Sequence, residues 1–489
     1  MKSALRAVAS RMPQNTNVND TLEFKLGTVK LRTICSVAIL IGASSAAILS
    51  QDTRHVIEPQ VPPACTIVPA RLDYHGDRLL QADAPLDTAI IQKAIDHCKS
   101  GHAVVLKAAD GHNALLTGPV ALRPGVTLVV DRGVHLVASN DPKDYDRFPG
   151  SCGLTNQKGG GCRPLISALR ADHSGIMGEG VIEGRGDQKL TNIPVTWWEM
   201  HDQKQGNVSH NIPWLVGTED TNDFTLYRIT LRDAPNFNVF LSGGDGVTVW
   251  GVKIDEPWNS PNTDGVDPSG CTNVTLTYSY IRNGDDVIAI KAPKGKPSEH
   301  ITVAHNHFYE GHGMSIGSGT EGGVSDVQFV DNTLDHMKAG IHIKSNPGRG
   351  GLVNKIVFDN ICIRNTTTPI DLETTYIDAN APRAGWINGR ALPSYRDIVF
   401  HNVQTQGGSK LRVTGIDAEH RTELQLDGVQ IGNLDHMKAT VSHARVTLGP
   451  GPSNWIPTGD DVATIGRSGK GKLPSCDAVF VPFPKADER

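Results

Sequence analysis

Aromatic residues, basic charge and paired cysteine motifs are all scarce in this sequence. It has 11 Phe, 8 Tyr and 7 Trp in 489 residues, and 47 Lys and Arg against 52 Asp and Glu, a net charge of −5. Without a basic surface we expect no nucleic acid partner. The absence of a Cys-x-x-Cys pair argues against a zinc ribbon or a thioredoxin-type site. At 38% hydrophobic and 20% charged residues, the chain is nevertheless too apolar to be disordered.

The first fifty residues differ from the rest of the chain. Lys30 and Arg32 precede an apolar run at 34–49 that ends in small residues, which is typical of a secretory signal peptide. The run has 16 residues, fewer than the ~20 that span a bilayer, so a retained membrane anchor is the less favoured alternative. We expect residues 1–55 to be an N-terminal extension with a signal segment, and residues 56–489 to be a secreted domain without stable membrane association.

Seven cysteines follow the apolar run, which agrees with export. Cys152 and Cys162 bracket a glycine-rich loop, and Cys65 with Cys98 could tie down the N-terminal segment. Both pairs are candidate disulfides of an oxidising compartment. An odd number leaves at least one thiol free.

A short strand of β-branched and apolar residues recurs along the chain, followed by a turn and a second strand. The repeats are separated by 23, 27, 27, 26, 29, 42 and 26 residues. They begin at Phe224, Val247, Val274, Ile301, Val327, Ile356, Ile398 and Leu424. Because each unit is too small to bury a face alone, this period predicts an all-β solenoid, a single-stranded parallel β-helix. A β-sandwich, whose strands recur every ~8–12 residues, is the alternative.

Two irregular segments belong to this prediction. The stretch after Asp87 has apolar Ile90, Ile91, Ala94 and Ile95 at helical spacing, so we expect a helix that caps the N-terminal end of the stack. The one long interval contains a loop at 373–396, which we expect to line a groove.

Four short polar segments fall on consecutive predicted coils: NTDG at 262–265, GDD at 284–286, GHG at 311–313 and GIHIK at 340–344. Stacking brings residues one coil apart to within about 4.8 Å, or twice that. Asp285 and His312 are 27 residues apart, so we expect them to be near neighbours. Closely spaced carboxylates have pKa values pushed apart into acid and base roles. Three aspartates with a histidine and a lysine are therefore suited to hydrolysing a glycosidic bond.

These segments and longer strings such as SPNTDGVDP, GDDVIAIKAPKG and GHGMSIGS resemble glycoside hydrolase family 28, the polygalacturonases, and most closely the secreted bacterial enzymes. The resemblance spans roughly residues 65–448. It implies a right-handed parallel β-helix that hydrolyses α-1,4-galacturonosyl bonds of pectin with inversion, without a metal or other cofactor. The cysteine pairs also match the pattern of the bacterial enzymes.

The resemblance also implies a role for each matching residue. Asp285 would be the general acid, while Asp264 and Asp286 would position and deprotonate the attacking water. His312 would hold the acid's protonation and orientation, and Lys344 would bind a substrate carboxylate. Two further residues are expected at the groove: Asn262, as a support, and Tyr376, as a sugar contact.

One departure concerns the segment His342-Ile343-Lys344, where the family usually has Arg-Ile-Lys. Arginine holds a carboxylate with two parallel donors and a permanent charge, whereas histidine is mostly neutral above pH ~6.5. We expect His342 to bind substrate, but more weakly, with recovery at acidic pH. Asn238, where the bacterial enzymes commonly have histidine, is a second departure.

Several alternatives remain at this point. The substrate could be another pectic polymer such as rhamnogalacturonan, or the protein could be a non-catalytic carbohydrate-binding β-helix. A calcium-dependent pectate lyase is less favoured because the motifs contain no arginine base. His305 with His307 could suggest a metal pair, but a solvated face is the favoured interpretation because no further ligands lie nearby in the sequence. Trp197 with Trp198 could form a sugar platform, but packing explains them at least equally well. We expect a secreted monomer, with endo action favoured over exo.

Overall fold

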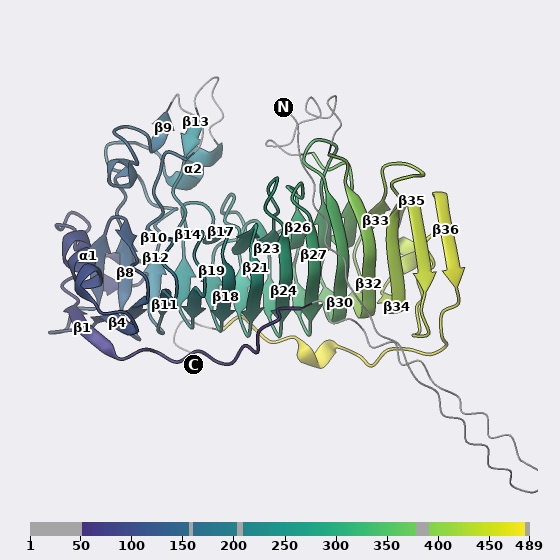
Figure 1. The fold of residues 1–489 in the computed structure, drawn as a ribbon, viewed down its shortest axis with the longest axis horizontal. Helices are drawn as coiled ribbons and strands as arrows, with labels where there is room; N and C mark the ends of the chain where they lie inside the picture. The colour runs from purple at the N-terminus through teal and green to yellow at the C-terminus, as the bar shows by residue number, and fades with distance from the viewer. Residues whose placement is uncertain (1–50, 156–159, 203–208, 378–390, 485–489) are drawn as a thin grey trace, which may run out of the picture. The chain divides into compact units, whose positions relative to one another are not determined.

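The computed structural model describes residues 51–155, 160–202, 209–377 and 391–484. The predicted signal run, most of the predicted loop at 373–396 and the last five residues lie outside these ranges. Figure 1 shows the described part as a stack of short strands joined by tight turns. No helix among the described residues has the length and apolar character needed to cross a membrane.

Three ladders of parallel strands run along the stack, one on each side of a coil. The first ladder comprises β1 (Ala64–Pro69), β4 (His102–Lys107), β7 (Val126–Val130), β11 (Gly175–Met177), β15 (Thr225–Tyr227), β18 (Asp245–Trp250), β21 (Thr272–Thr277), β24 (Ser298–Ala304) and β27 (Val324–Val330). The second ladder comprises β5 (Ala114–Thr117), β8 (His135–Ala138), β12 (Val181–Glu183), β16 (Thr230–Arg232), β19 (Lys253–Asp255), β22 (Tyr280–Arg282), β25 (His307–Tyr309) and β28 (Thr333–Asp335). Long strands β30 (Leu352–Arg364), β32 (Ser394–Gln406) and β34 (Thr422–Ile431) then continue both ladders, and β36 (Asp460–Gly466) ends the stack.

The third ladder carries the polar segments singled out above. It comprises β6 (Val120–Ala121), β10 (Ile166–Leu169), β14 (Val216–Glu219), β17 (Val239–Ser242), β20 (Val266–Ser269), β23 (Asp286–Ile290), β26 (Gly313–Gly317), β29 (Ala339–Lys344), β31 (Thr368–Glu373), β33 (Lys410–Thr414) and β35 (Lys438–Leu448). All of its pairings are parallel. The predicted fold class, a right-handed parallel β-helix, is confirmed, and the sandwich alternative is wrong.

The predicted repeat matches the strand register residue by residue. On the first ladder, the repeat starts at Val247, Val274, Ile301, Val327, Ile356, Ile398 and Leu424 are consecutive Cα partners. Each of these side chains is buried. The spacing of apolar residues in the sequence therefore gives the number of residues in one coil. The 42-residue interval keeps the same register, with Ile356 opposite Ile398.

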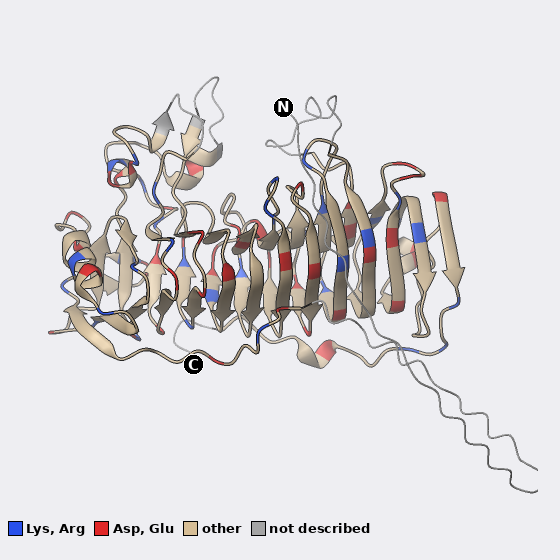
Figure 2. Cartoon of the chain, in the orientation of Figure 1, with Lys and Arg blue, Asp and Glu red and all other residues tan. Residues whose placement is uncertain are grey.

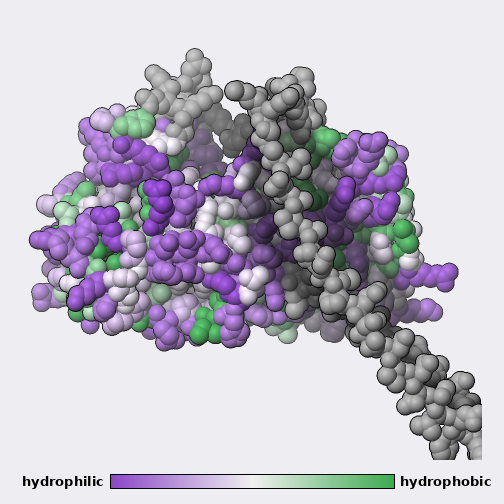
Figure 3. All heavy atoms as spheres, in the orientation of Figure 1, coloured by the Kyte–Doolittle hydropathy of each residue, from purple (hydrophilic) through white to green (hydrophobic). Residues whose placement is uncertain are grey.

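The interior of the stack is filled by aliphatic side chains and a few aligned rings. Phe329 and Phe358 stack with ring centroids 4.6 Å apart, and Phe400 meets Phe358 edge-on at 5.3 Å. At the turn between the first and second ladders, Asn306 and Asn332 hydrogen-bond to each other at 3.0 Å and donate to backbone carbonyls. Charged residues of both signs are interspersed along the coils (Figure 2), and the visible outer face is mostly hydrophilic (Figure 3).

The N-terminal region contains the expected helix and both expected disulfides. Helix α1 (Thr88–His97) buries Ile91 and Ile95 in the main core and contacts β1 and β6; its role as a cap stays a prediction. The Cys65–Cys98 and Cys152–Cys162 bonds are both present. A second helix, α2 (Trp197–Asp202), and two small antiparallel pairs, β2 (Tyr74–His75) with β3 (Arg78–Leu79) and β9 (Gly153–Thr155) with β13 (Ser209–Asn211), complete this region.

The chain preceding β1 lies along the first ladder. The Asp52 backbone N–H donates to Thr302 at 2.9 Å, and the Arg54 guanidinium donates to the Val247 carbonyl at 2.9 Å. The boundary between the predicted segments 1–55 and 56–489 stays a prediction; among the described residues, contact with the solenoid is already present at Asp52.

Candidate active site

Consecutive rungs of the third ladder place the four polar segments side by side. Asp264 lies just before β20, Asp286 begins β23, and His312 lies just before β26. Asp286 is the Cα partner of Gly313, and Ser315 is the partner of His342. The stacking predicted from the coil period is therefore confirmed.

Glycines permit this close arrangement at two turns. A Cβ atom on Gly284 would lie 1.8 Å from the Ser260 carbonyl oxygen, so the turn before Asp285 admits no side chain. Gly311 has φ = 105°, a conformation that L-residues rarely adopt. The glycines beside the charged residues thus set the backbone path that brings Asp285 and His312 together.

Three carboxylates form the centre of the site. Asp264, Asp285 and Asp286 each offer one oxygen, and these oxygens all lie within 4.8 Å of one another. The side chains of Asp264 and Asp286 are 6% and 3% exposed, whereas that of Asp285 is 23% exposed. Asp285 is therefore the member of the trio most accessible to a substrate.

His312 holds Asp285 from the next rung. Its Nδ1 lies 3.0 Å from Asp285 Oδ1, and its backbone N–H donates to the Asp285 carbonyl at 2.7 Å. Burial acts to raise the pKa of Asp285, but the hydrogen bond and charge of His312, together with the charge of Lys344, lower this pKa overall. The Asp285 carboxyl group is therefore ionised in the free protein at neutral pH.

Asp286 is fixed by a donor on each oxygen. The Ser315 hydroxyl donates to Oδ1 at 2.7 Å, and Lys344 Nζ donates to Oδ2 at 2.7 Å. Burial acts to lower the pKa of Lys344, but the Asp286 charge raises it overall, so the ammonium stays charged. The same Nζ lies 5.1 Å from the centroid of the Tyr376 ring.

Lys291 and Asp267 are functional candidates that sequence reasoning missed. Lys291 Nζ donates to Asp264 Oδ2 at 3.2 Å and pairs with Asp267. Burial and the Asp267 charge raise the pKa of Asp264, and Lys291 opposes this shift; burial also raises the pKa of Asp267 to about 6. Both residues stand in the strings SPNTDGVDP and GDDVIAIKAPKG, one ladder rung apart, so register could have identified them.

His342 lies at the site, but its charge state differs from the expectation. It is 7% exposed, and its Nδ1 lies 3.2 Å from the Ser315 hydroxyl. Burial, followed by the charges of Lys344 and Arg412, lowers the pKa of His342 well below its ordinary value. This lowered pKa argues against the expected recovery of binding at mildly acidic pH, because desolvation beside two cations disfavours the charged imidazole.

The two remaining predicted residues lie at the margins of the cluster. The Asn262 amide donates to the Asn236 side chain, and Asn262 has φ = 55°. The Tyr376 ring meets that of His342 edge-on, with centroids 6.1 Å apart. Asn238, the second departure, is fully buried and its amide donates to the Asp264 carbonyl at 3.3 Å.

The aspartate trio is the one group of three or more potential metal ligands within the described residues. Its donor set does not fit a metal ion, because Lys344 contacts Asp286 and Lys291 contacts Asp264. Two ammonium groups already supply the positive charge and would repel a divalent cation. His305 and His307 instead stack on Tyr278 and Tyr280, with centroids 5.2 Å apart in each pair. Trp197 is fully buried, so packing explains it better than sugar binding.

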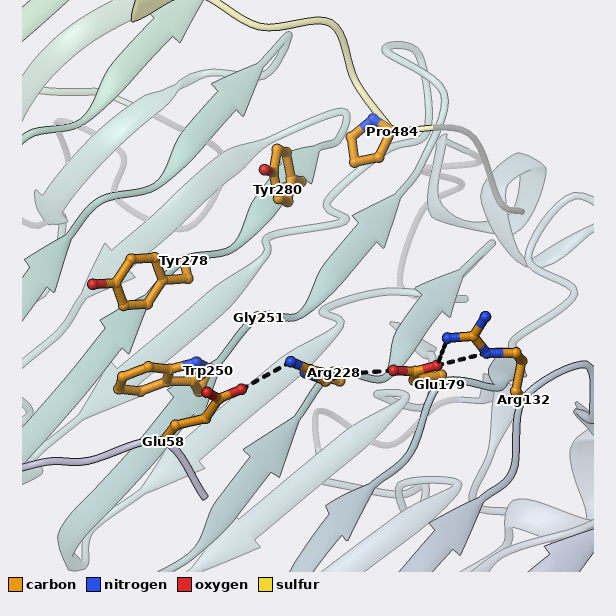
Figure 4. A pocket seen from close by; sticks show the side chains of 9 residues that line it. All are labelled: Glu58, Arg132, Glu179, Arg228, Trp250, Gly251, Tyr278, Tyr280 and Pro484. Atoms are coloured by element: carbon orange, nitrogen blue, oxygen red, sulfur yellow. Dashed lines mark hydrogen bonds and ion pairs between the residues drawn. The ribbon is translucent and has the colours of Figure 1, made fainter. Parts of the chain in front are cut away.

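A separate open cavity of about 660 Å³ lies where the first ladder turns into the second, away from the trio. Figure 4 shows its line of ion pairs, in which Arg228 bridges Glu58 at 2.9 Å and Glu179 at 3.1 Å. Because these charges neutralise one another and no general acid or base pair is present among the lining residues, we place the chemistry on the third ladder rather than here.

Comparison with known proteins agrees with this geometry. The family model described as glycosyl hydrolases family 28 matches residues 139–448. An endo-polygalacturonase of Pectobacterium parmentieri is 37% identical over 80% of this chain and 92% of its own, and a polygalacturonase of Ralstonia nicotianae is 34% identical over 90% and 95%. The solved polygalacturonase of Erwinia carotovora ssp. carotovora superimposes with a TM-score of 0.74 at 35% identity, covering 81% of this chain and all of the other.

Proposed function

The chain belongs to glycosyl hydrolases family 28, and from this premise we propose that it hydrolyses the α-1,4-galacturonosyl bonds of pectin by acid/base catalysis with inversion. The observation that carries the proposal is the register of the third ladder, which sets three carboxylates, one imidazole and two lysines on adjacent rungs. A pectic polysaccharide is the substrate class, as the names of the relatives state for those proteins.

Asp285 is the general acid in this proposal. It is the most exposed carboxylate of the trio, and its Oδ1 lies 3.0 Å from His312 Nδ1, within hydrogen-bonding distance. When a sugar chain displaces water from the groove, the loss of solvation disfavours the separated charges of the pair. The proton then moves to Asp285, which donates it to the leaving glycosidic oxygen, while His312 keeps the carboxyl group oriented.

Asp264 and Asp286 hold and deprotonate the attacking water. Both oxygens of Asp286 accept hydrogen bonds, and Asp264 accepts one from Lys291. Carboxylates engaged in this way are poor nucleophiles but can still accept a proton. We assign both residues to water activation, which corresponds to single displacement with inversion rather than a covalent intermediate.

The proposed substrate contacts are the residues that lie next to the three aspartates. Lys344 keeps its charge and lies beside the Tyr376 ring, so these two residues are suited to a sugar that carries a carboxylate. Asn262 and His342 complete the proposed binding surface, with His342 as a neutral hydrogen-bonding group.

Location and assembly are part of the same proposal. The Cys65–Cys98 and Cys152–Cys162 disulfides suit an oxidising compartment, and the apolar run at 34–49 is suited to export. We therefore place the enzyme outside the cytoplasm, as a monomer without stable membrane association. Size-exclusion chromatography of the secreted protein tests the oligomeric state.

De-esterified homogalacturonan is the substrate that tests the function. The proposal predicts new reducing ends without unsaturated ends, no dependence on calcium, and a ladder of oligomers early in the reaction. Unsaturated ends that disappear with a chelator would indicate a lyase and contradict the proposal. Monomer as the sole early product would contradict endo action, and cleavage of rhamnogalacturonan alone would contradict the substrate.

A further inference from the structure

The segment at 473–484, called the C-terminal strap below, crosses the outside of the second ladder. Figure 1 shows the yellow C-terminal segment running back along the stack from β36. The Gln404 amide donates to the Pro474 carbonyl at 2.8 Å, and the Tyr309 hydroxyl donates to the Val481 carbonyl at 2.9 Å. The strap thus joins strands that are far apart in sequence.

One outward row of the second ladder receives most of the strap. Arg282, Tyr309, Asp335, Arg364 and Gln406 are consecutive partners in this row. Along it, Gln406 binds Asp477, Arg364 lies 4.1 Å from the Phe480 ring centroid, and Arg282 lies 4.4 Å from that of Phe483. A short 3-10 turn at Asp477–Val479 interrupts the strap. The strap still contacts four of the five rungs of this row, at Gln406, Arg364, Tyr309 and Arg282.

Two buried thiols meet beneath this strap. Cys362 on β30 and Cys476 in the strap are 3% and 6% exposed and line the same cavity. The interaction of the two thiols shifts their pKa values in opposite directions. They are the only pair among the three thiols that the described residues leave free, because Cys271 donates instead to the carbonyls of Leu241 and Gly243.

We propose that Cys362 and Cys476 form a third disulfide, which locks the C-terminal strap onto the second ladder once the protein is in an oxidising compartment. The oxidant is a disulfide-bearing molecule, either a protein disulfide donor or oxidised glutathione. Cys476 is the attacking thiol, since its contact with Cys362 lowers its pKa and raises that of Cys362.

The thiol–disulfide exchange proceeds in two steps. The Cys476 thiolate forms a mixed disulfide and releases one thiol of the oxidant. The Cys362 thiolate then attacks the Cys476 sulfur and releases the second oxidant thiol. Two electrons pass to the oxidant, and the two protons of the cysteines end on its thiols. Val479 and Val481 of the strap are 45% and 37% exposed, so solvent reaches the outer side of the strap; the proposal includes an opening of the strap that admits the oxidant to the thiols beneath it.

The consequence concerns the C-terminal coils. The bond would close a loop of 114 residues that includes β31 and β33, the two rungs that follow the strand of His342. Cross-linking a long loop lowers the entropy of the unfolded chain. The strap lies on the second ladder, away from the trio, so the disulfide should change resistance to heat without changing KM.

Peptide mapping of the exported wild-type protein, denatured and alkylated without reductant, tests the proposal. We expect a cross-linked peptide that contains Cys362 and Cys476, with alkylation at Cys271 alone among the described cysteines. Alkylation of both Cys362 and Cys476 in the folded, exported protein would overturn the proposal.

Variants provide a second, independent readout. Cys476→Ser and Cys362→Ser should each lower the thermal midpoint by about 5 °C, and the double variant should be no worse than either. The difference from wild type should vanish when all proteins are melted in reductant. A deficit that persists in reductant would assign the effect to packing and overturn the proposal.

Discussion

The first and third ladders pass through the same coils with the same backbone but use their rungs in opposite ways. On the first ladder, Val274, Ile301 and Val327 repeat one buried apolar position. On the third, the same heights hold Asp286, Ser315 and His342, which are also buried. The repeated apolar residues of the first ladder form the core. The buried polar residues of the third ladder are those to which we assign the catalytic and binding roles.

Charged pairs show the same contrast. Lys355 and Asp326 on the first ladder are 3.4 Å apart, with the lysine 49% exposed, whereas Lys344 and Asp286 are 2.7 Å apart and buried. An exposed pair contributes ~0–1 kcal/mol, but a buried pair carries a desolvation cost that only good geometry offsets. The Lys344–Asp286 pair is therefore held in place by the fold and is not expected to add much to the free energy of unfolding.

Asp285→Asn should have the largest effect on activity, and it tests whether the third ladder carries the catalytic residues. The amide can still accept from the Asp286 backbone N–H, which donates to Asp285 Oδ1 at 2.9 Å, but it has no proton to give. We expect kcat on polygalacturonate to fall by about 10²–10⁴-fold. The thermal midpoint at neutral pH should also fall, because the lowered pKa of Asp285 means that its ionised form stabilises the fold.

The matched control is Asp326→Asn on the first ladder, where φ = 56° suits asparagine. Its kcat should equal that of the wild type. If Asp285→Asn kept full activity, the general-acid assignment would be wrong.

The sequence predicted the fold better than the site because the two depend on different information. The apolar period alone located the rungs from Val247 to Leu424. The trio with His312 followed from the same period, aided by the family resemblance. Lys291 and Asp267 were missed because their importance lies in cross-rung contacts. The neutral state of His342 depends on burial beside Lys344 and Arg412, which no local string reveals.

Lys291→Met should produce the next largest effect, and the effect should appear in the pH profile. Burial and Asp267 already raise the pKa of Asp264, and Lys291 opposes them. Removing this cation raises the pKa further, so Asp264 is protonated up to a higher pH. Because the base must be ionised, the acidic limb of kcat/KM should move to higher pH, with a loss of about tenfold for each unit moved.

Lys355→Met, which removes an exposed lysine paired with Asp326, is the control and should leave the profile unchanged. An acidic limb that stayed in place in Lys291→Met would show that Lys291 does not tune Asp264.

The smallest effect is expected for His342→Arg. A permanent cation beside the trio should strengthen contact with a substrate carboxylate, partly offset by Lys344 and Arg412 nearby. We expect KM on polygalacturonate to fall by about threefold to tenfold, as for one charge-assisted hydrogen bond, with kcat little changed. His342→Gln, which stays neutral, should not lower KM. An unchanged KM in His342→Arg would remove His342 from the binding surface.

The most direct test of the central claim is the configuration of the first product, followed by proton NMR during hydrolysis of an oligogalacturonate. One oxygen from each carboxylate of the trio lies within 4.8 Å of the other two. This distance is shorter than the ~6.5–9.5 Å usual between the carboxyl groups of inverting enzymes, so distance alone does not predict inversion and the product must be observed directly. If Asp285 donates the proton while Asp264 and Asp286 activate water, the β-anomer must appear first. An initial α-anomer would mean that a carboxylate attacks the sugar, and would contradict the account.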